Sequence, residues 1–510
     1  MNPTSSAGRS RGSAAIAGHI SRGTTAPQPR TLFVAAGLLL AGILLAGALV
    51  LGGVEAATIM LAMQIGVLAL SRPRSALWMS VAFLVYACVF YIRWTPIATV
   101  KESGYVGTAV GLATIAMGLG VSWLSAARRR LAVRKNAVVR RFDKAMYAMF
   151  GVSLIASVYG MARGNEWSLV ARQLFGCLLL LGYYLLARTF FRSAEDIRRW
   201  LTWASVAVTA GAAWYTVKLT LLSFSEGAYS REQSPLTFFA GAIGALLFVK
   251  LLSEQQWKKR IVMAVSLLFC VLAILLMGAR FVAGSLAGTA LILLILRQGK
   301  HRLLMGLAML ALVAMAVGFA LSRLPELIEQ GGLPGEIAGR FSPLNVGEDL
   351  SYVGRMAEMQ SVLAIVKQHP ILGAGMGAEV SYYAPESPGV FGTAAYVDNG
   401  WGFVLLKMGL LGLWVFVAML WSFLRFAARE WPSNAPAHMQ RVQACLLALL
   451  LFGLLSFIGG PTFFQFITSG FMGTTLGALA ALAELASRTP SLLADASPRQ
   501  VAVLSFRKAA

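Results

Sequence analysis

The sequence predicts an all-α integral membrane protein, and three observations lead to this class. Hydrophobic residues make up 58% of the 510 residues and charged residues only 13%, whereas a soluble chain of this length needs far more polar surface. The apolar residues gather in runs close to the ~20 residues that cross a bilayer as a helix. The basic residues lie in the tails and in short linkers between those runs, as the positive-inside rule requires.

The chain begins with a polar tail and continues through about fourteen predicted spans. Residues 1–30 hold four arginines and no acidic residue, which indicates a disordered cytoplasmic tail. The apolar run that follows is too long for the core of a cleaved signal peptide, so we expect a retained first span. The spans that we predict are 31–52, 54–71, 75–93, 105–125, 145–161, 169–190, 199–224, 234–252, 261–277, 281–297, 303–322, 401–426, 441–458 and 467–485.

The linkers predict the orientation of these spans. Counted outward from a cytoplasmic N-terminus, every basic cluster falls on the cytoplasmic side. The clusters are Arg72 with Arg74, the run from Arg128 to Lys144, Arg192 with Arg198 and Arg199, Lys258 to Arg260, and Arg297 with Lys300 and Arg302. An even number of spans also returns the tail 487–510 to the cytoplasm. We therefore expect spans 1–11 over 31–322, spans 12–14 over 401–486, and both termini in the cytoplasm.

Residues 323–400 form the longest hydrophilic segment, and we expect a structured loop on the outer, periplasmic side. The segment holds nine acidic and four basic residues, the reverse of the rest of the chain. Within it, residues 354–368 carry an apolar stripe at helical spacing, which predicts an amphipathic helix that ends before Pro370. Met356, Met359, Val362, Leu363 and Val366 form the stripe, while Arg355, Glu358, Ser361 and Gln368 fall off it. Gly373, Gly375 and Gly377 predict a flexible turn, and long structured loops are where function concentrates.

Composition also excludes several classes of function. The net charge is 44 − 21 = +23, but its placement in linkers and tails argues against a nucleic-acid partner. All four cysteines (Cys88, Cys177, Cys270 and Cys445) lie inside apolar runs without a CxxC pair, so we expect neither a disulfide framework nor a metal cluster. The GxGxG at Gly373 follows a helix rather than a strand, so it is no dinucleotide fingerprint. We predict no metal and no cofactor.

A set of short motifs resembles the O-antigen ligase and O-antigen polymerase family over about residues 280–415. These motifs are Gly354–Arg355 at a helix start, Pro370–Ile371–Leu372–Gly373–Ala374–Gly375, Gly409–Leu410–Leu411–Gly412 in the re-entry helix, and Gly278–Ala279–Arg280 between two spans. In one respect the chain departs from the pattern. Family ligases carry a His-Asn pair where the loop returns to the membrane, and here that pair reads Asp398–Asn399.

The resemblance implies transfer of a glycan from a polyprenyl diphosphate carrier to an acceptor hydroxyl, at the periplasmic face of the bacterial inner membrane. Arginine suits the departing diphosphate because its planar fork donates two hydrogen bonds and stays charged, so we assign Arg280 and Arg355 to catalysis. Asp398 is the predicted base for the attacking hydroxyl. Substrate contacts are predicted at Asn399, Arg172, Arg231 and Tyr396. The expected partners are the lipid-linked oligosaccharide, membrane lipids and a polysaccharide assembly or chain-length partner.

The three catalytic assignments and that of Asn399 each have a purely structural alternative. Arg280 could reach lipid headgroups, Arg355 could pair with Glu358 or Glu348 on its helix surface, and Asp398 or Asn399 could cap the following helix. At the level of function, a polymerase is favoured over a ligase because the ligase histidine is missing and the spans exceed the usual dozen. A transporter or lipid flippase and a non-catalytic scaffold remain as alternative classes.

Overall fold

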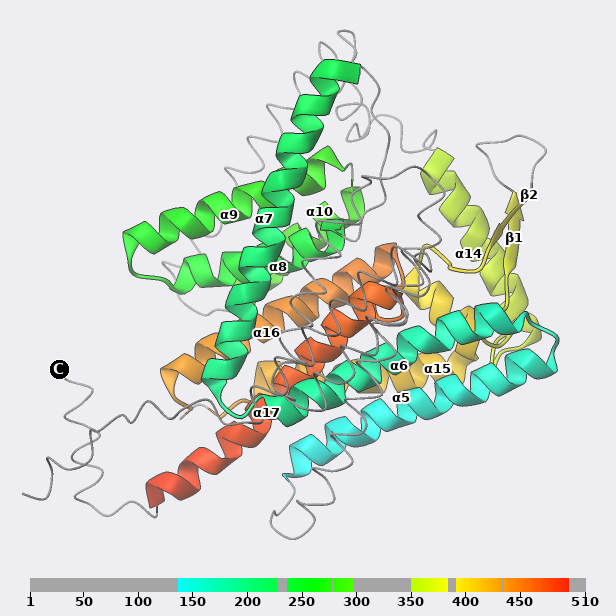
Figure 1. The fold of residues 1–510 in the computed structure, drawn as a ribbon. Helices are drawn as coiled ribbons and strands as arrows, with labels where there is room; N and C mark the ends of the chain where they lie inside the picture. Colours follow the sequence, from blue (N-terminus) through cyan, green and yellow to red (C-terminus); the bar gives the residue numbers. More distant parts are fainter. Residues whose placement is uncertain are drawn as a thin grey trace, which may run out of the picture.

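The computed structural model describes residues 136–226, 236–277, 279–296, 350–383, 391–432 and 435–494. Ten α-helices and one two-stranded sheet make up these ranges (Figure 1). The helices are α5 Ala137–Ala162, α6 Trp167–Phe190, α7 Ala194–Glu226, α8 Leu236–Ser253, α9 Trp257–Leu276, α10 Arg280–Leu296, α14 Leu350–Gln368, α15 Gly400–Arg425, α16 Ala437–Ser456 and α17 Phe466–Ala494. A π-helical turn, η3 Phe426–Glu430, continues α15, and a 3₁₀ turn, η4 Phe457–Gly459, continues α16.

Seven helical segments in the described ranges are long and apolar enough to cross a membrane. They coincide with the predicted spans 145–161, 169–190, 234–252, 261–277, 401–426, 441–458 and 467–485. The predicted spans 199–224 and 281–297 are also helical, but α7 is less apolar and α10 has only 17 residues. The tail 1–30 and the predicted spans 31–52, 54–71, 75–93, 105–125 and 303–322 lie outside the described residues, so the total of fourteen stays a prediction.

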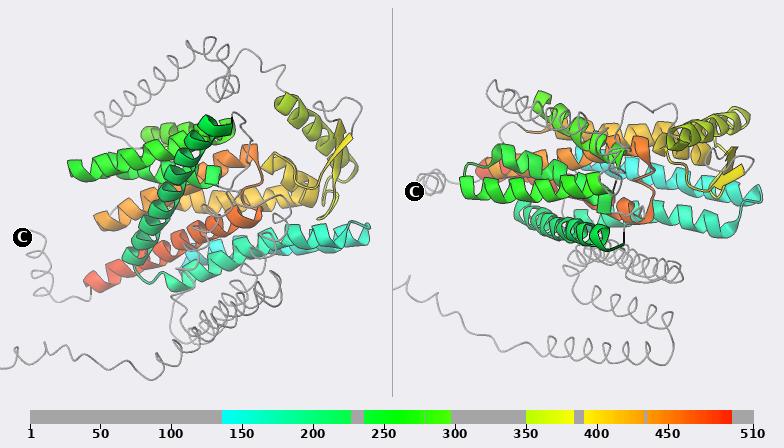
Figure 2. Two further views of the ribbon diagram at one scale, coloured as in Figure 1. Left: turned by 45° about the horizontal axis from the view of Figure 1, so that its top comes forward. Right: turned by 90° about the horizontal axis from the view of Figure 1, so that it is seen from above.

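Helices α5, α6, α15, α16 and α17 run alongside one another, with α8, α9 and α10 as a second group beside α16 (Figures 1 and 2). The closest packing is between α6 and α17, where the sequence of α17 supplies small residues. A Cβ atom at Gly473 would lie under 3.0 Å from the Leu180 carbonyl, and one at Gly477 equally close to that of Tyr184. Small residues four positions apart therefore let the two helix backbones touch, as in other membrane helix pairs.

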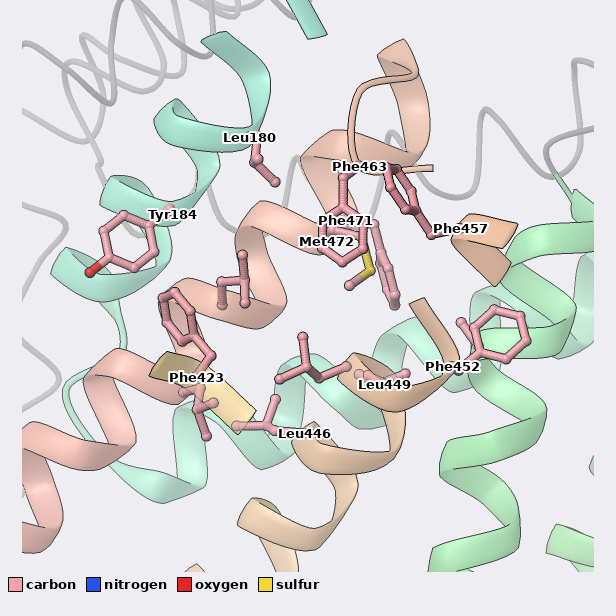
Figure 3. Close-up of a cluster of buried hydrophobic side chains, with 14 of the residues drawn as sticks. Leu180, Tyr184, Phe423, Leu446, Leu449, Phe452, Phe457, Phe463, Phe471 and Met472 are labelled. Carbon is pink, nitrogen blue, oxygen red and sulfur yellow. The ribbon is translucent and has the colours of Figure 1, made fainter. Parts of the chain in front are cut away.

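A continuous apolar core joins these helices, and Figure 3 shows its centre. Aromatic rings dominate it: Phe416 packs against Phe457, Phe463 and Phe464 with ring centroids 4.9 to 5.4 Å apart. The labelled core residues come from α6, α15, α16, η4, α17 and the turn before α17: Leu180, Tyr184, Phe423, Leu446, Leu449, Phe452, Phe457, Phe463, Phe471 and Met472. Offset and edge-on ring pairs of this kind add to the dispersion contacts that hold membrane helices together.

The two ends of the bundle carry different elements. At one end, Arg141 of α5 pairs with Glu430 of η3, and Arg188 of α6 pairs with Asp143 of α5. The other end of α5 and α6 lies about 39 Å away, given 26 residues at 1.5 Å each, and there α14 and the strands gather beside the α5–α6 turn (Figures 1 and 2). The described part of the loop and the ion pairs of Arg141 and Arg188 therefore lie at opposite ends of these helices.

The structure corrects details of the predicted loop and extends the last predicted helix. An antiparallel hairpin, β1 Val380–Tyr383 with β2 Phe391–Ala394, pairs Val380 with Ala394 and Tyr383 with Phe391, so the fold is not purely helical. The loop helix begins at Leu350, four residues before the predicted start. At the C-terminal side, α17 includes the predicted span 467–485 and continues to Ala494.

The buried face of α14 is also rotated from the predicted stripe. Met356 and Leu363 are 45% and 46% exposed, whereas Glu358, predicted to lie off the stripe, is 5% exposed. Val362 is fully buried as predicted. The reason is that Glu358 has a hydrogen-bond partner inside the protein, described below, and a partner removes most of the cost of burying a polar group.

Candidate functional site

The motif after Pro370 packs into a break in the membrane helix α15. Gly409 of α15 has φ +62° and ψ −159°, which interrupts the helix. Across the break, the N–H groups of Leu410 and Leu411 donate to the carbonyls of Pro370 and Ile371, at 2.9 and 3.1 Å. The N–H of Ala374 donates in turn to the carbonyl of Leu406, at 2.7 Å. Backbone groups freed by the break are thus satisfied by the loop, as membrane depth requires.

Glycine makes this docking possible. Gly373 and Gly409 both have positive φ, and a Cβ atom on either would lie under 3.0 Å from backbone atoms of the other segment. Gly375 and Gly377 also have positive φ and are buried. The predicted flexible turn is therefore a closely packed one, because each glycine allows a backbone conformation and a contact that a side chain would prevent.

Two amide side chains from the α5–α6 region hold the same turn from the other side. Asn165 donates its Nδ2 to the carbonyls of Ala374 and Met376, at 3.1 and 2.8 Å. Gln173, which is fully buried, accepts the N–H of Gly377 at 2.7 Å and donates to the carbonyl of Ala395 at 2.8 Å. Gln173 therefore ties the glycine turn to the chain that follows the hairpin.

Lys407 supplies a third tie from within α15. Its side chain is fully buried, and its Nζ donates to the carbonyl of Ala378, just before the hairpin. The ammonium also lies 5.7 Å from the centroid of the Phe403 ring, within reach of a cation–π contact. These contacts hold the start of β1 against the first turns of α15.

The loop then brings two predicted site residues together. Nε of Arg355 lies 3.2 Å from Oδ2 of Asp398, and the two side chains are 27% and 60% exposed. Of the two partners that helix spacing suggested, Glu358 forms no ion pair with Arg355 in the described part of the chain, and Glu348 lies outside the described residues. The pair faces solvent, so both side chains are accessible to a ligand from outside.

Glu358 lies beneath this pair. Its Oε2 accepts the backbone N–H of Asp398 at 3.0 Å. Burial raises the pKa of the Glu358 carboxyl above its ordinary 4.5, and the nearby Asp398 carboxylate acts in the same direction. The Asp398 N–H bond and the Arg355 guanidinium act the other way. Two carboxylates and one guanidinium thus meet at the point where the loop returns to α15.

Asn399 caps α15, one of the structural roles foreseen for it. Its Oδ1 accepts the N–H groups of Trp401 and Gly402, at 2.9 and 3.2 Å. An Asn in this position satisfies donors that a helix start leaves unpaired. Asp398 is therefore not the cap, and its carboxylate pairs with Arg355 instead.

The first turn of α10 approaches the same pair. The Phe281 ring lies under the Arg355 guanidinium, 4.6 Å from its Cζ to the ring centroid. Arg280, the first residue of α10, is exposed and directly precedes Phe281 in the chain. The predicted residues Arg280, Arg355 and Asp398 therefore belong to one region.

Arg172 and Tyr396 lie together on the α6 side of the hairpin. Burial raises the pKa of the Tyr396 phenol to about 12, and the nearby Arg172 guanidinium acts in the opposite direction. One face of the Tyr396 ring stacks on Phe403, with centroids 5.8 Å apart. Arg172 itself is exposed. The remaining predicted contact, Arg231, lies outside the described residues.

Sequence reasoning missed four polar residues that shape the site: Asn165, Gln173, Glu358 and Lys407. Lys407 stands alone inside an apolar run, and Gln173 follows Arg172 inside another; a polar residue in such a run is a usable signal, because it must find a partner. Asn165 and Glu358 lie among other polar residues, where spacing alone does not reveal which of them is buried.

A comparison with protein families supports this region as the functional one. Residues 265–417 match a family model described as O-Antigen ligase. The match includes α10, α14, the hairpin and the first part of α15, and so contains Arg280, Arg355 and Asp398. No curated protein matches the chain.

Seven apolar helices and this match define a multi-pass bacterial membrane protein. Residues 265–417 belong to the O-antigen ligase and polymerase family, whose members are glycosyltransferase-like membrane enzymes. The resemblance predicted from the motifs is thereby confirmed.

Proposed function

We propose that this protein polymerises or transfers a polyprenyl-diphosphate-linked glycan at the periplasmic face of the inner membrane. The observation that carries the proposal is the solvent-facing pair of Arg355 and Asp398, with Phe281 and hence the start of α10 beside it. The pair lies at the end of α5 and α6 opposite Arg141 and Arg188, whose neighbouring basic linkers the positive-inside rule assigns to the cytoplasm. The end that holds the pair therefore faces the periplasm in this proposal, with both termini cytoplasmic.

The residues have separate roles in the reaction. Arg355 and Arg280 bind the diphosphate of the lipid carrier and stabilise the charge that grows as the bond from the sugar carbon to the phosphate oxygen breaks. Asp398 takes the proton of the acceptor hydroxyl while that oxygen forms the new bond to the sugar carbon. The products are the extended glycan and the free lipid diphosphate, so the transfer balances without a metal or cofactor.

The remaining assignments concern the sugars. Arg172 beside Tyr396 offers a guanidinium and a neutral phenol to hydroxyl groups of the glycan. The oxygen of Asn399 is used by the helix cap, so its amide NH₂ is the group offered to a sugar. Arg231 retains its predicted role as a substrate contact. A polysaccharide assembly or chain-length partner is also part of the proposal.

Within this class, a polymerase is favoured over a ligase. The residue before Asn399 is Asp398 rather than the histidine of family ligases, and the predicted spans outnumber the dozen usual for them. A ligase that uses Asp398 as its base is the alternative, and the acceptor decides between the two.

One observation favours a transporter or flippase instead. The membrane helix α15 is broken at Gly409 and carries the fully buried Lys407, features that transporters use to bind ions. In this chain, however, the break is filled by the Pro370–Ala374 turn, and Lys407 donates to Ala378. Because the protein itself occupies these groups, we favour transfer over transport.

The test is glycan transfer by the purified full chain from a polyprenyl diphosphate oligosaccharide, with Arg280→Ala, Arg355→Ala and Asp398→Asn beside wild type. Lys367→Ala, an exposed change on the same helix as Arg355, is the matched control. We expect wild type and the control to transfer glycan and the three variants to lose at least tenfold in rate while remaining monodisperse. A ladder of products indicates a polymerase, and a single product on a lipid acceptor indicates a ligase. Equal rates in all five proteins, or movement of lipid across the bilayer without transfer, would overturn the proposal.

A further inference from the structure

We propose that Glu358 is a positioning residue that fixes Asp398, and through it the Arg355–Asp398 pair, from beneath. The inference rests on the proposed function for its catalytic consequence, but its structural content stands by itself. It assigns a role to the one polar side chain of α14 that is buried among those described.

A carboxylate at position 358 is costly to bury. Glu358 is 5% exposed, although the residues beside it on the helix, Ala357 and Met359, are only partly buried. A buried carboxylate without compensation is strongly unfavourable, so its burial requires partners that repay the lost hydration. Its hydrogen-bond donor is the backbone N–H of Asp398, 40 positions further along the chain.

Two residues of α14 contact Asp398 from the same side. Arg355 and Glu358 are three positions apart and therefore lie on one side of α14. Arg355 contacts the side chain of Asp398, at 3.2 Å, and Glu358 contacts its backbone, at 3.0 Å. The contact from Glu358 determines the position of the Asp398 backbone, and the contact from Arg355 determines the direction of its carboxylate. One contact alone would not determine both.

The helix that carries these contacts is itself closely seated on α15. A Cβ atom at Gly402 would lie 3.2 Å from Sδ of Met359, the residue that follows Glu358. Asn399, directly after Asp398, is held by its cap contacts at the start of α15. Asp398 is thus the link between two fixed elements, and Glu358 determines how that link is oriented.

The hydrogen bond does not depend on the charge of Glu358, because a neutral carboxyl or amide also offers an oxygen to an N–H donor. Glu358→Gln should therefore preserve the contact, whereas Glu358→Ala should remove it. Gln360→Ala is the matched control, since Gln360 is an exposed polar residue on the same helix.

The experiment has a readout that does not need activity. Val397, next to Asp398, is 1% exposed, so a Val397→Cys thiol reports whether this part of the loop stays in place. The thiol is introduced into the full chain after replacement of Cys88, Cys177, Cys270 and Cys445 by alanine, and its rate of maleimide labelling is measured in detergent. We expect at least tenfold faster labelling with Glu358→Ala, and rates within threefold of the parent with Glu358→Gln and Gln360→Ala.

Glycan transfer supplies the second readout. We expect Glu358→Ala to lower kcat at least tenfold with KM for the lipid-linked donor within threefold, and Glu358→Gln to restore most of the rate. If labelling with Glu358→Ala equals the Gln360→Ala control, or if Glu358→Gln labels as fast as Glu358→Ala, the inference is overturned. If Glu358→Ala does not fold, slow labelling and transfer by Glu358→Gln support the inference, and fast labelling overturns it. If wild type transfers no glycan, the proposed function fails, while the labelling rates still decide the role of Glu358.

Discussion

Arg355 and Asp398 are 43 positions apart in the chain, and the structure joins them through Nε and Oδ2 at 3.2 Å. An ion pair in this place has a chemical consequence, because a diphosphate that binds Arg355 competes with Asp398 for the same guanidinium. Binding of the donor would then release the carboxylate at the moment a base is required.

The identity of the cation at position 355 should matter as much as its charge. Arg355→Lys keeps the charge, but it loses the planar fork and the flat stacking on Phe281. We expect glycan transfer to fall at least tenfold, and Lys367→Arg, on the exposed side of the same helix, to leave it unchanged. Full activity of Arg355→Lys would show that a simple charge suffices.

Gly373 and Gly409 should tolerate no side chain. Both have positive φ, and a Cβ atom on either would collide with backbone of the other segment. We expect Gly373→Ala and Gly409→Ala to lower the thermal unfolding temperature strongly or to prevent recovery of folded protein. Gly151→Ala and Gly284→Ala are the controls, since a Cβ atom there meets nothing within 4 Å. Similar losses in all four variants would mean that helix glycines in general, rather than this contact, are sensitive.

The cap that Oδ1 of Asn399 forms should contribute to stability, separately from the contact proposed between its NH₂ group and the glycan. Asn399→Ala removes the acceptor for the N–H groups of Trp401 and Gly402, which costs about 1 kcal/mol in typical helix caps. Asn399→Ser should retain most of that stability because Ser is also a good cap. Thermal unfolding in detergent measures both. Unchanged stability of Asn399→Ala would contradict the cap, and a loss of transfer in Asn399→Ser, which lacks the NH₂ group, would support the contact with the glycan.

Gln173 should be needed for the turn to stay closed. Gln173→Leu leaves the N–H of Gly377 and the carbonyl of Ala395 without their partner, at about 1–3 kcal/mol for each buried group left unpaired. We expect a lower unfolding temperature and faster proteolysis in the loop. Arg172→Leu, an exposed neighbour, should unfold like wild type, and the idea is wrong if both variants are equally stable.

Glu358 should make stability depend on pH in a defined direction. Its pKa is raised in the folded protein, chiefly by burial, so folding favours the protonated form. The stability from this group is therefore complete below its ordinary value of 4.5 and is lost as pH rises through the folded pKa. We expect the unfolding temperature of wild type to fall relative to that of Glu358→Gln as pH rises from about 4 to neutrality. A constant difference across that range would contradict the shift.

The motifs that could be recognised in the sequence correspond to contacts in the structure. The Pro370–Gly375 turn and the Gly409–Gly412 segment were separate motifs along the chain, and the hydrogen bonds from Leu410 to Pro370 and from Leu411 to Ile371 make them one unit. The hairpin could not be foreseen, because its strands have four residues each and pair only with one another. Such short strands carry too few residues for an alternating pattern to be distinguished from a loop.

The sequence by itself determined the membrane class, the seven apolar helices of the described ranges and the family motifs that contain Arg280, Arg355 and Asp398. These follow from composition, run length and spacing, which are properties of the chain alone. Only the tertiary structure decided that Arg355 pairs with Asp398, that Asn399 is the cap, and that Glu358 and Lys407 are buried. The physical reason is that a polar side chain is buried where a partner compensates its lost hydration, and such partners lie far away in sequence.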